Sequence, residues 1–166
     1  RVRVLDILMF GKEALGQYQI HPRFELLVGD IRDKKIVDKS MKDVFAICHL
    51  AALVGEPACA VNTKLSNEIN VLATEYLLKK AKETKVQRFI FASTCSNYGI
   101  TKAGKEVDEF FHLQALSTYA KTKISAEKIV NAYDNSSLST TILRLGTLYG
   151  VSPRMRFNLL LNQAVR

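Results

Sequence analysis

Two tyrosine–lysine pairs, each with a spacing of four residues, are the side chains in this sequence best suited to chemistry: Tyr119 with Lys123, and Tyr76 with Lys80. A helix brings residues four apart onto one face, one turn above the other. There an ammonium group can lower the pKa of a phenol and stabilise the phenolate. Such a tyrosine can exchange a proton with a sugar or alcohol hydroxyl near neutral pH.

The surroundings of the two pairs differ. Tyr76 belongs to an apolar stripe at helical spacing, which is typical of a core helix face: Ile69, Leu72, Ala73, Tyr76, Leu77 and Ala81. Tyr119 instead follows a polar, irregular segment and opens a helix. Upstream of it, residues 89–99 form an apolar strand pattern that ends in hydroxyl side chains. Ligand sites in parallel sheets lie at the carboxyl ends of strands, so we interpret Tyr119 as functional and Tyr76 as structural.

The elements that would position these residues alternate between strand and helix patterns. Short apolar or β-branched runs predict strands at 1–5, 24–28, 44–50, 88–93 and 140–145. Helical patterns cover 64–84 and 118–133, and shorter helical pieces are predicted near 33–42 and 154–166. Such alternation predicts parallel βαβ units and an α/β fold.

Composition fits one globular unit. The 166 residues are 48% hydrophobic and 24% charged, enough for a single sizeable core. The net charge of +8 comes from lysines and arginines scattered among acids, so we predict no nucleic-acid partner. No apolar run approaches the roughly 20 residues that cross a bilayer, so we expect no membrane contact. Cys48, Cys59 and Cys95 are odd in number and lack metal-ligand spacing, which favours a cytoplasmic protein with reduced thiols and no metal site.

Five segments occur in the order and spacing of a known family: Val2–Asp6, Val28–Asp33, His49–Ala52, Ser93–Gly99 together with Tyr119 and Lys123, and Leu143–Gly150. In these segments the chain resembles the extended short-chain dehydrogenase/reductases, specifically the NAD-dependent nucleotide-sugar epimerase/dehydratase family. The resemblance implies a Rossmann-type doubly wound parallel sheet. Residues 1–150 would form a partial NAD-binding domain, and residues 151–166 would begin the substrate-binding region.

The glycine-rich phosphate loop of that family is missing from the pattern. None of the eight glycines forms Gly-x-Gly-x-x-Gly, the loop that cradles the cofactor pyrophosphate with backbone N–H groups. In the family, the strand before this loop is central in the sheet, between the strands predicted at 1–5 and 44–50. We therefore expect a sheet that lacks its first, central strand. The chain would be a portion of a longer polypeptide, or would receive this element from elsewhere.

The resemblance implies NAD-binding residues after several strands: Asp6, Asp30, Ile31, Leu50, Ala51, Ala52, Tyr119 and Lys123. The Asp6 carboxylate would accept hydrogen bonds from the adenosine ribose hydroxyls and repel a 2′-phosphate, which favours NAD over NADP. Asp30 and Ile31 would flank the adenine, while Ala51 and Ala52 would let the cofactor approach the backbone. The alternatives are a turn cap at Asp6, a simple turn at Asp30 and tight helix–strand packing at the alanines.

By the same resemblance, catalysis rests on three side chains. Thr94 would hydrogen-bond the reacting sugar oxygen, and Tyr119 would act as acid and base on that hydroxyl. Lys123 would lower the pKa of Tyr119 and hold the nicotinamide ribose. The alternative for Thr94 is a turn hydroxyl at the strand end. Substrate contacts are implied for Thr94, Thr147 and Asn158.

The residues after Thr94 narrow the reaction. Family 4,6-dehydratases carry Asp-Glu there as an acid/base pair for eliminating water, whereas this chain has Cys95 and Ser96. The best fit is an epimerase, or a reductase, that acts on a nucleotide-sugar substrate through a transient keto-sugar, with a homodimer as a compatible assembly. The alternative is a non-catalytic relative that uses the fold as a binding scaffold. Cys95 and His49 are interpreted as packing residues.

Overall fold

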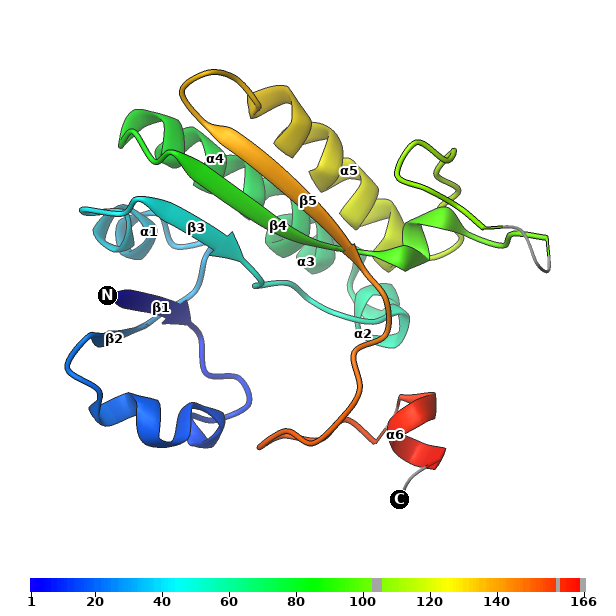
Figure 1. The fold of residues 1–166 in the computed structure, drawn as a ribbon, viewed down its shortest axis with the longest axis horizontal. Coiled ribbons are helices and arrows are strands. Elements are labelled where there is room, and N and C mark those ends of the chain that lie inside the picture. Colours follow the sequence, from blue (N-terminus) through cyan, green and yellow to red (C-terminus); the bar gives the residue numbers. More distant parts are fainter. Residues whose placement is uncertain (103–105, 158, 165–166) are drawn as a thin grey trace.

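The computed structural model describes residues 1–102, 106–157 and 159–164 (Figure 1). The strands are β1 (Val2–Asp6), β2 (Phe24–Val28), β3 (Ala46–His49), β4 (Arg88–Thr94) and β5 (Ser139–Leu145). The α-helices are α1 (Lys34–Ser40), α2 (Glu56–Val61), α3 (Thr63–Asn67), α4 (Ala73–Glu83), α5 (Thr118–Tyr133) and α6 (Leu160–Ala164). The described ranges also contain the 3-10 helices η1 (Glu13–Ile20) and η3 (Cys95–Tyr98) and the π-helix η2 (Glu68–Leu72).

All five predicted strands form, each within two residues of its predicted bounds. The helical pattern at 64–84 becomes α3, η2 and α4 in succession, and the pattern at 118–133 is α5. The sequence analysis missed η1, α2 and η3. Helix α2 begins with proline in its first turn, where the missing N–H costs nothing because no intrahelical partner exists there.

The strands form two parallel sheets. β1 pairs with β2, with Val2 opposite Phe24 at the start of the ladder. β3, β4 and β5 form a second sheet with β4 in the centre, where Phe89 lies between Ile47 and Thr140. Within the described ranges, β1 and β3 do not pair with each other. The predicted Rossmann-type parallel architecture is confirmed, and the two sheets are interrupted at the position expected for the central strand.

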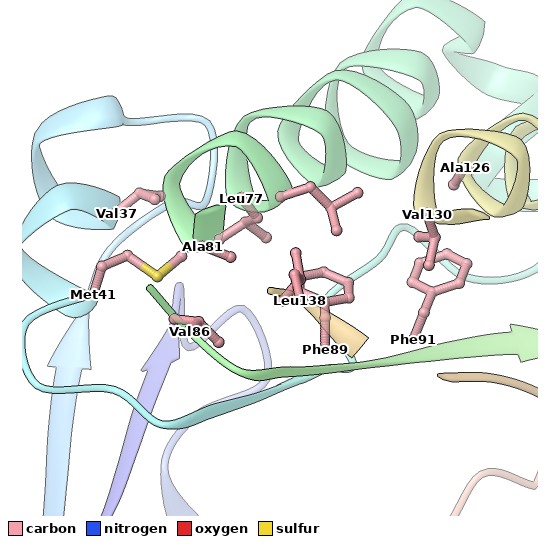
Figure 2. Close-up of a cluster of buried hydrophobic side chains, with 11 residues drawn as sticks. Val37, Met41, Leu77, Ala81, Val86, Phe89, Phe91, Ala126, Val130 and Leu138 are labelled. Carbon is pink, nitrogen blue, oxygen red and sulfur yellow. The ribbon is translucent and has the colours of Figure 1, made fainter. Parts of the chain in front are cut away.

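Helices α4 and α5 lie side by side along one face of the three-stranded sheet (Figure 1). On that face, Phe89 and Phe91 of β4 are almost fully buried, whereas Ile90 between them is only half-buried. Figure 2 shows the core, to which α1, α4, α5 and β4 contribute: Val37, Met41, Leu77, Leu78, Ala81, Val86, Phe89, Phe91, Ala126, Val130 and Leu138. Burying one large apolar side chain contributes about 1.5–3 kcal/mol, so this cluster is what holds α5 and its polar residues against the sheet.

Tyr76 and Lys80 join α4 to α1 at the margin of this core. The Tyr76 hydroxyl donates a hydrogen bond to Asp38 at 2.8 Å, and its ring packs against the core cluster. Lys80 forms ion pairs with Asp38 at 3.4 Å and with Glu83 at 2.8 Å. Burial, followed by Asp38, raises the pKa of Tyr76. This pair therefore serves packing, as its apolar stripe indicates.

Candidate active site

The predicted cofactor and catalytic residues follow the carboxyl ends of four parallel strands. Asp6 ends β1, Ile31 lies beyond β2, Ala51 lies beyond β3 and Thr94 ends β4. Because the paired strands are parallel, the ends of β1 and β2 lie together, and so do the ends of β3 and β4. The topology therefore places these residues in two groups, each at the carboxyl edge of a parallel sheet, which is where α/β folds bind ligands.

Asp6 holds the turn that follows β1. Its exposed carboxylate accepts a hydrogen bond from the backbone N–H of Leu8 at 2.6 Å. Leu8 has a φ of 55°, which is uncommon for a residue other than glycine. One oxygen of the Asp6 carboxylate therefore caps the turn, as in the alternative role. The contact with ribose hydroxyls stays a prediction.

Asp30 is engaged with the chain itself. Its carboxylate forms an ion pair with Arg32 at 2.6 Å, and Arg32 also reaches Glu68 at 3.2 Å. Hydrogen bonding to Arg32 is the largest cause that lowers the pKa of Asp30. Ile31 is buried beside it, and the Asp30 carbonyl accepts the N–H of Asp33 in a turn. The geometry matches the turn alternative, and the adenine contact stays a prediction.

Asn70 fixes the segment that follows β3, where the cofactor is expected to approach residues 50–52. Its side chain accepts the N–H of Leu53 at 2.8 Å and donates to the Leu53 carbonyl at 3.0 Å. It also donates to Thr122 of α5 at 3.0 Å, which ties this segment to the helix that bears Tyr119. Asn70 lies in the π-helix η2, a feature often found at functional sites. The sequence analysis missed Asn70, although a polar amide within an apolar helix pattern could have indicated it.

Thr94 is the last residue of β4 and caps η3. Its hydroxyl accepts the N–H of Ser96 at 3.2 Å and donates to the Ser96 hydroxyl at 3.1 Å, with the side chain mostly buried. Thr94 therefore has the role given as its alternative, a hydroxyl in the turn at the strand end. The contact with a sugar oxygen stays a prediction.

The first turn of α5 is held by two side chains. The Ser117 hydroxyl accepts the N–H of Ala120 at 3.1 Å, and the Glu56 carboxylate accepts the N–H of Tyr119 at 3.0 Å. Backbone hydrogen bonds from Tyr119 and then Thr118 lower the pKa of Glu56. These caps satisfy backbone donors that a helix start leaves without partners, and they fix the position of Tyr119.

In this structure burial, and not Lys123, sets the direction of the Tyr119 pKa, and the effect of Lys123 on the phenol stays a prediction. Tyr119 is half-buried, and burial raises its pKa, with Arg156 acting in the opposite direction. The Lys123 ammonium lies 4.0 Å from the centre of the Phe91 ring on β4, within reach of a cation–π interaction. Helical spacing puts the pair on one face but does not direct the long lysine side chain.

Lys123 itself is 3% exposed. Burial lowers its pKa to about 8, and the negative charge of Glu127 opposes that shift. His49 faces the same space: its Nε2 lies 2.9 Å from the Thr74 hydroxyl, and burial followed by Lys123 lowers its pKa to about 3. The interpretation of His49 as a core histidine is confirmed. Lys123 is thus a buried cation whose pKa of about 8 lies near neutral pH.

A second polar cluster, missed in the sequence, lies one turn further along α5. Glu127 is buried and accepts hydrogen bonds from Ser93, from Asn97 at 2.7 Å and from Arg144 at 2.8 Å. Burial at this place would be costly for an acid without partners. The available signal was an acidic residue at helical spacing from Lys123 on an otherwise buried face.

Of the three predicted substrate residues, Thr94 directly follows Ser93 of this cluster. Thr147 is exposed, just beyond β5. Asn158 lies outside the described residues. The segment between them carries Arg156, whose positive charge opposes the effect of burial on the Tyr119 pKa. Asn162 holds this segment, with its side chain bonded to the Arg156 carbonyl at 3.2 Å.

Neither a metal-binding cluster nor a membrane-spanning helix occurs within the described ranges. No group of three or more His, Cys, Asp or Glu residues there could hold a metal ion. In the same part of the chain, no helix has the length and apolar character needed to cross a membrane.

The parallel sheets and the helices that flank them define an α/β protein of the Rossmann class. Over residues 5–165 the chain matches the NAD dependent epimerase/dehydratase family. Because the match covers nearly the whole sequence, the chain belongs to this family. NAD is the cofactor of the family.

Relatives with curated descriptions include nucleotide-sugar enzymes. An uncharacterized UDP-glucose epimerase of Bacillus subtilis is 37% identical over 132 residues, which are 74% of this chain and 40% of that protein. A putative UDP-glucose 4-epimerase of Methanocaldococcus jannaschii is 29% identical over 151 residues, 90% of this chain and 48% of that protein. The chain thus spans about half, or less, of the length of these relatives.

Solved structures give the same result. The dTDP-glucose 4,6-dehydratase DesIV of Streptomyces venezuelae, a double mutant with NAD bound, superposes with a TM-score of 0.88 at 30% identity and covers 99% of this chain and 51% of its own. The UDP-glucuronic acid 4-epimerase of Bacillus cereus, in complex with UDP-glucuronic acid and NAD, gives a TM-score of 0.84 at 27% identity. The match covers 99% of this chain and 55% of the epimerase. The chain is therefore similar to about half of each enzyme.

Proposed function

We propose that the protein containing this chain is an NAD-dependent epimerase, or a related oxidoreductase, that acts on a nucleotide-diphosphate sugar through a transient keto-sugar. The observation that carries the proposal is the arrangement of α5 against the end of β4. There the half-buried phenol of Tyr119 and the buried ammonium of Lys123 share one helix, next to the strand that ends in Thr94.

In this proposal the chain moves one proton and orients one sugar. The phenol oxygen of Tyr119 exchanges a proton with the reacting hydroxyl, and Thr94 hydrogen-bonds the same sugar oxygen. The Lys123 ammonium stabilises the phenolate when its side chain turns from Phe91 toward Tyr119. NAD supplies the acceptor and donor of the hydride. Hydride addition to the other face of the keto-sugar, with the proton returned to the sugar oxygen by Tyr119, would invert the configuration at that carbon.

The chain's residues fit NAD. A carboxylate ends β1, where ribose hydroxyls would bind, and small side chains follow β3, where a cofactor can approach the backbone. The residues proposed to hold it are Asp6, Asp30, Ile31, Leu50, Ala51, Ala52, Tyr119 and Lys123. Residues 1–150 would be part of the cofactor domain and 151–166 the start of the substrate region, with Thr147 and Asn158 as substrate contacts.

The residues after Thr94 favour epimerisation over dehydration. Eliminating water needs an acid and a base beside the keto-sugar, and Cys95 and Ser96 occupy the positions where the family's dehydratases carry Asp-Glu. The Ser96 hydroxyl is bonded to Thr94 at 3.1 Å, which uses it within the turn. A reaction that only oxidises and reduces the sugar requires no such pair.

The thiols of Cys48, Cys59 and Cys95 are free, which supports a reducing compartment such as the cytoplasm.

A non-catalytic scaffold is the second candidate. It is favoured by the absence of Gly-x-Gly-x-x-Gly from these 166 residues, since that loop binds the pyrophosphate. A scaffold that has lost catalysis would bind neither NAD nor sugar tightly.

The test uses the full-length protein that contains this chain. Purified protein is denatured and its supernatant assayed for NAD, and intact protein is incubated with UDP-glucose, UDP-glucuronic acid or dTDP-glucose. We expect bound NAD and the slow appearance of an epimer, followed by proton NMR of the sugar ring. Protein without NAD that leaves all three sugars unchanged would contradict the proposal and favour the scaffold.

A further inference from the structure

Glu127 is a buried acid whose partners come from three other elements. Its side chain is 3% exposed. Asn97 of η3 donates to one carboxylate oxygen at 2.7 Å, and Ser93 of β4 donates to the same oxygen. Arg144 of β5 donates to the other oxygen at 2.8 Å from Nη2, and from Nε at 3.2 Å to both. The carboxylate therefore joins α5 to the ends of both neighbouring strands.

The partners stand next to the proposed catalytic residues. Ser93 immediately precedes Thr94, and Asn97 belongs to the turn that Thr94 caps. Arg144 also donates to the Tyr98 hydroxyl at 3.3 Å and to the Glu109 carbonyl at 2.9 Å, which ties β5 to the end of η3 and to Glu109. Movement of Glu127 would therefore disturb the end of β4, on which Thr94 lies.

Stability alone does not explain such an ion pair. Removing an acid and a guanidinium from water costs much of what their attraction returns, and apolar residues of similar size often stabilise a core as well. A buried, fully bonded charge next to a candidate catalytic cation therefore suggests a role in the site.

Glu127 also faces Lys123. The two are four residues apart on α5, both are buried, and the negative charge of Glu127 acts on the ammonium. From the other elements, the ammonium lies 4.0 Å from the centre of the Phe91 ring of β4, and its charge acts on His49 of β3, whose low pKa of about 3 leaves it neutral. Of these groups, Glu127 is the one that carries a negative charge.

We propose that Glu127 is a positioning residue of the active site, whose carboxylate locks the end of β4 and η3 against α5 and keeps the Lys123 side chain available to Tyr119 as a cation. Arg144 is its counter-charge, which limits how strongly that negative charge acts on Lys123. The inference rests on the proposed function, because Lys123 is the group through which Glu127 would affect turnover.

Two substitutions that should shift the Lys123 pKa in opposite directions test it in the full-length protein. Glu127→Gln keeps the shape and removes the charge, so the Lys123 pKa should fall from about 8 by about one unit, a tenfold change in the ammonium-to-amine ratio. Arg144→Gln leaves the charge of Glu127 without its partner, so the Lys123 pKa should rise. The readouts are the Cε shift of Lys123 in protein with ¹³C-labelled lysine, and the alkaline limb of kcat against pH.

Glu25→Gln is the matched control. Glu25 likewise accepts from arginines, Arg1 and Arg3, each at 2.9 Å, but it lies on β2. Its substitution should leave the Lys123 titration where it is in wild type. Loss of packing alone would move the Lys123 pKa in the same direction in the Glu127 and Arg144 variants.

The outcomes separate this inference from the proposed function. Opposite shifts of the Lys123 pKa and of the alkaline limb support it, whereas no shift, or shifts of the same sign, would overturn it. If Glu127→Gln does not fold, Arg144→Gln decides, with an upward shift in support and any other result against. If wild-type protein holds NAD but converts no sugar, the proposed function fails, and the NMR titration alone still decides the role of Glu127.

Discussion

At the scale of single residues, burial sets the chemistry of the Tyr119–Lys123 pair more strongly than spacing does. Burial raises the pKa of the phenol and lowers that of the ammonium to about 8, so both groups are drawn toward their neutral forms. We expect the Lys123 ammonium to leave the Phe91 ring for the phenol when the enzyme works. Only then does the positive charge favour the phenolate.

Asp6 carries a prediction on the choice of cofactor. Asp6→Ala removes up to two charge-assisted hydrogen bonds to the ribose, worth about 1.5–3 kcal/mol each. NAD affinity of the full-length protein should therefore fall, while NADP affinity should fall less or improve, because the charge that repels a 2′-phosphate is gone. Titration calorimetry with each dinucleotide measures both. Equal affinity of the unmutated protein for NAD and NADP would refute the assignment.

At the scale of elements, α5 depends on the caps that start it. Ser117→Ala removes the hydroxyl that accepts the Ala120 N–H, and the loss of such a cap costs about 0.5–2 kcal/mol. We expect that decrease in the free energy of unfolding of the full-length protein, measured with urea. Ser125→Ala is the control, because the Ser125 hydroxyl only donates to the Lys121 carbonyl on an exposed face and should change stability by less. Equal effects of the two variants would mean that the cap contributes little.

Strands and long helices were predictable, whereas the short helices and the polar network were not. β4 and α5 carry strong local patterns in apolar content and periodicity. Helix η3 depends on the Thr94 hydroxyl at its start, and no apolar period marks it. The partners of Glu127 lie 17 to 34 residues away, so their meeting depends on tertiary packing rather than on sequence spacing. The direction of the Lys123 side chain was missed for the same reason.

At the scale of the whole molecule, the main feature is that β1 and β3 each have an edge without a strand partner among the described residues. A strand edge exposes backbone N–H and C=O groups that bind another strand readily. We predict that in the full-length protein a parallel strand carrying the phosphate loop lies between β1 and β3. The amide hydrogens of both strands should then exchange slowly, and faster in the isolated 166-residue chain, which should also bind NAD weakly. A structure of the full-length protein with β1 bonded directly to β3 would contradict this.

The central claim is that Tyr119 is the acid and base of the reaction, and one comparison tests it most directly. Tyr119→Phe removes only the oxygen that exchanges the proton, so NAD and nucleotide-sugar affinities should hardly change while turnover of the full-length enzyme falls by about 10²–10⁴. Tyr76 has the same spacing to a lysine, but its hydroxyl donates to Asp38 in the packing of α4. Tyr76→Phe should therefore leave turnover nearly unchanged. Steady-state turnover of the two variants, measured side by side, gives the answer. An active Tyr119→Phe enzyme, or a Tyr76→Phe enzyme without turnover, would contradict the account.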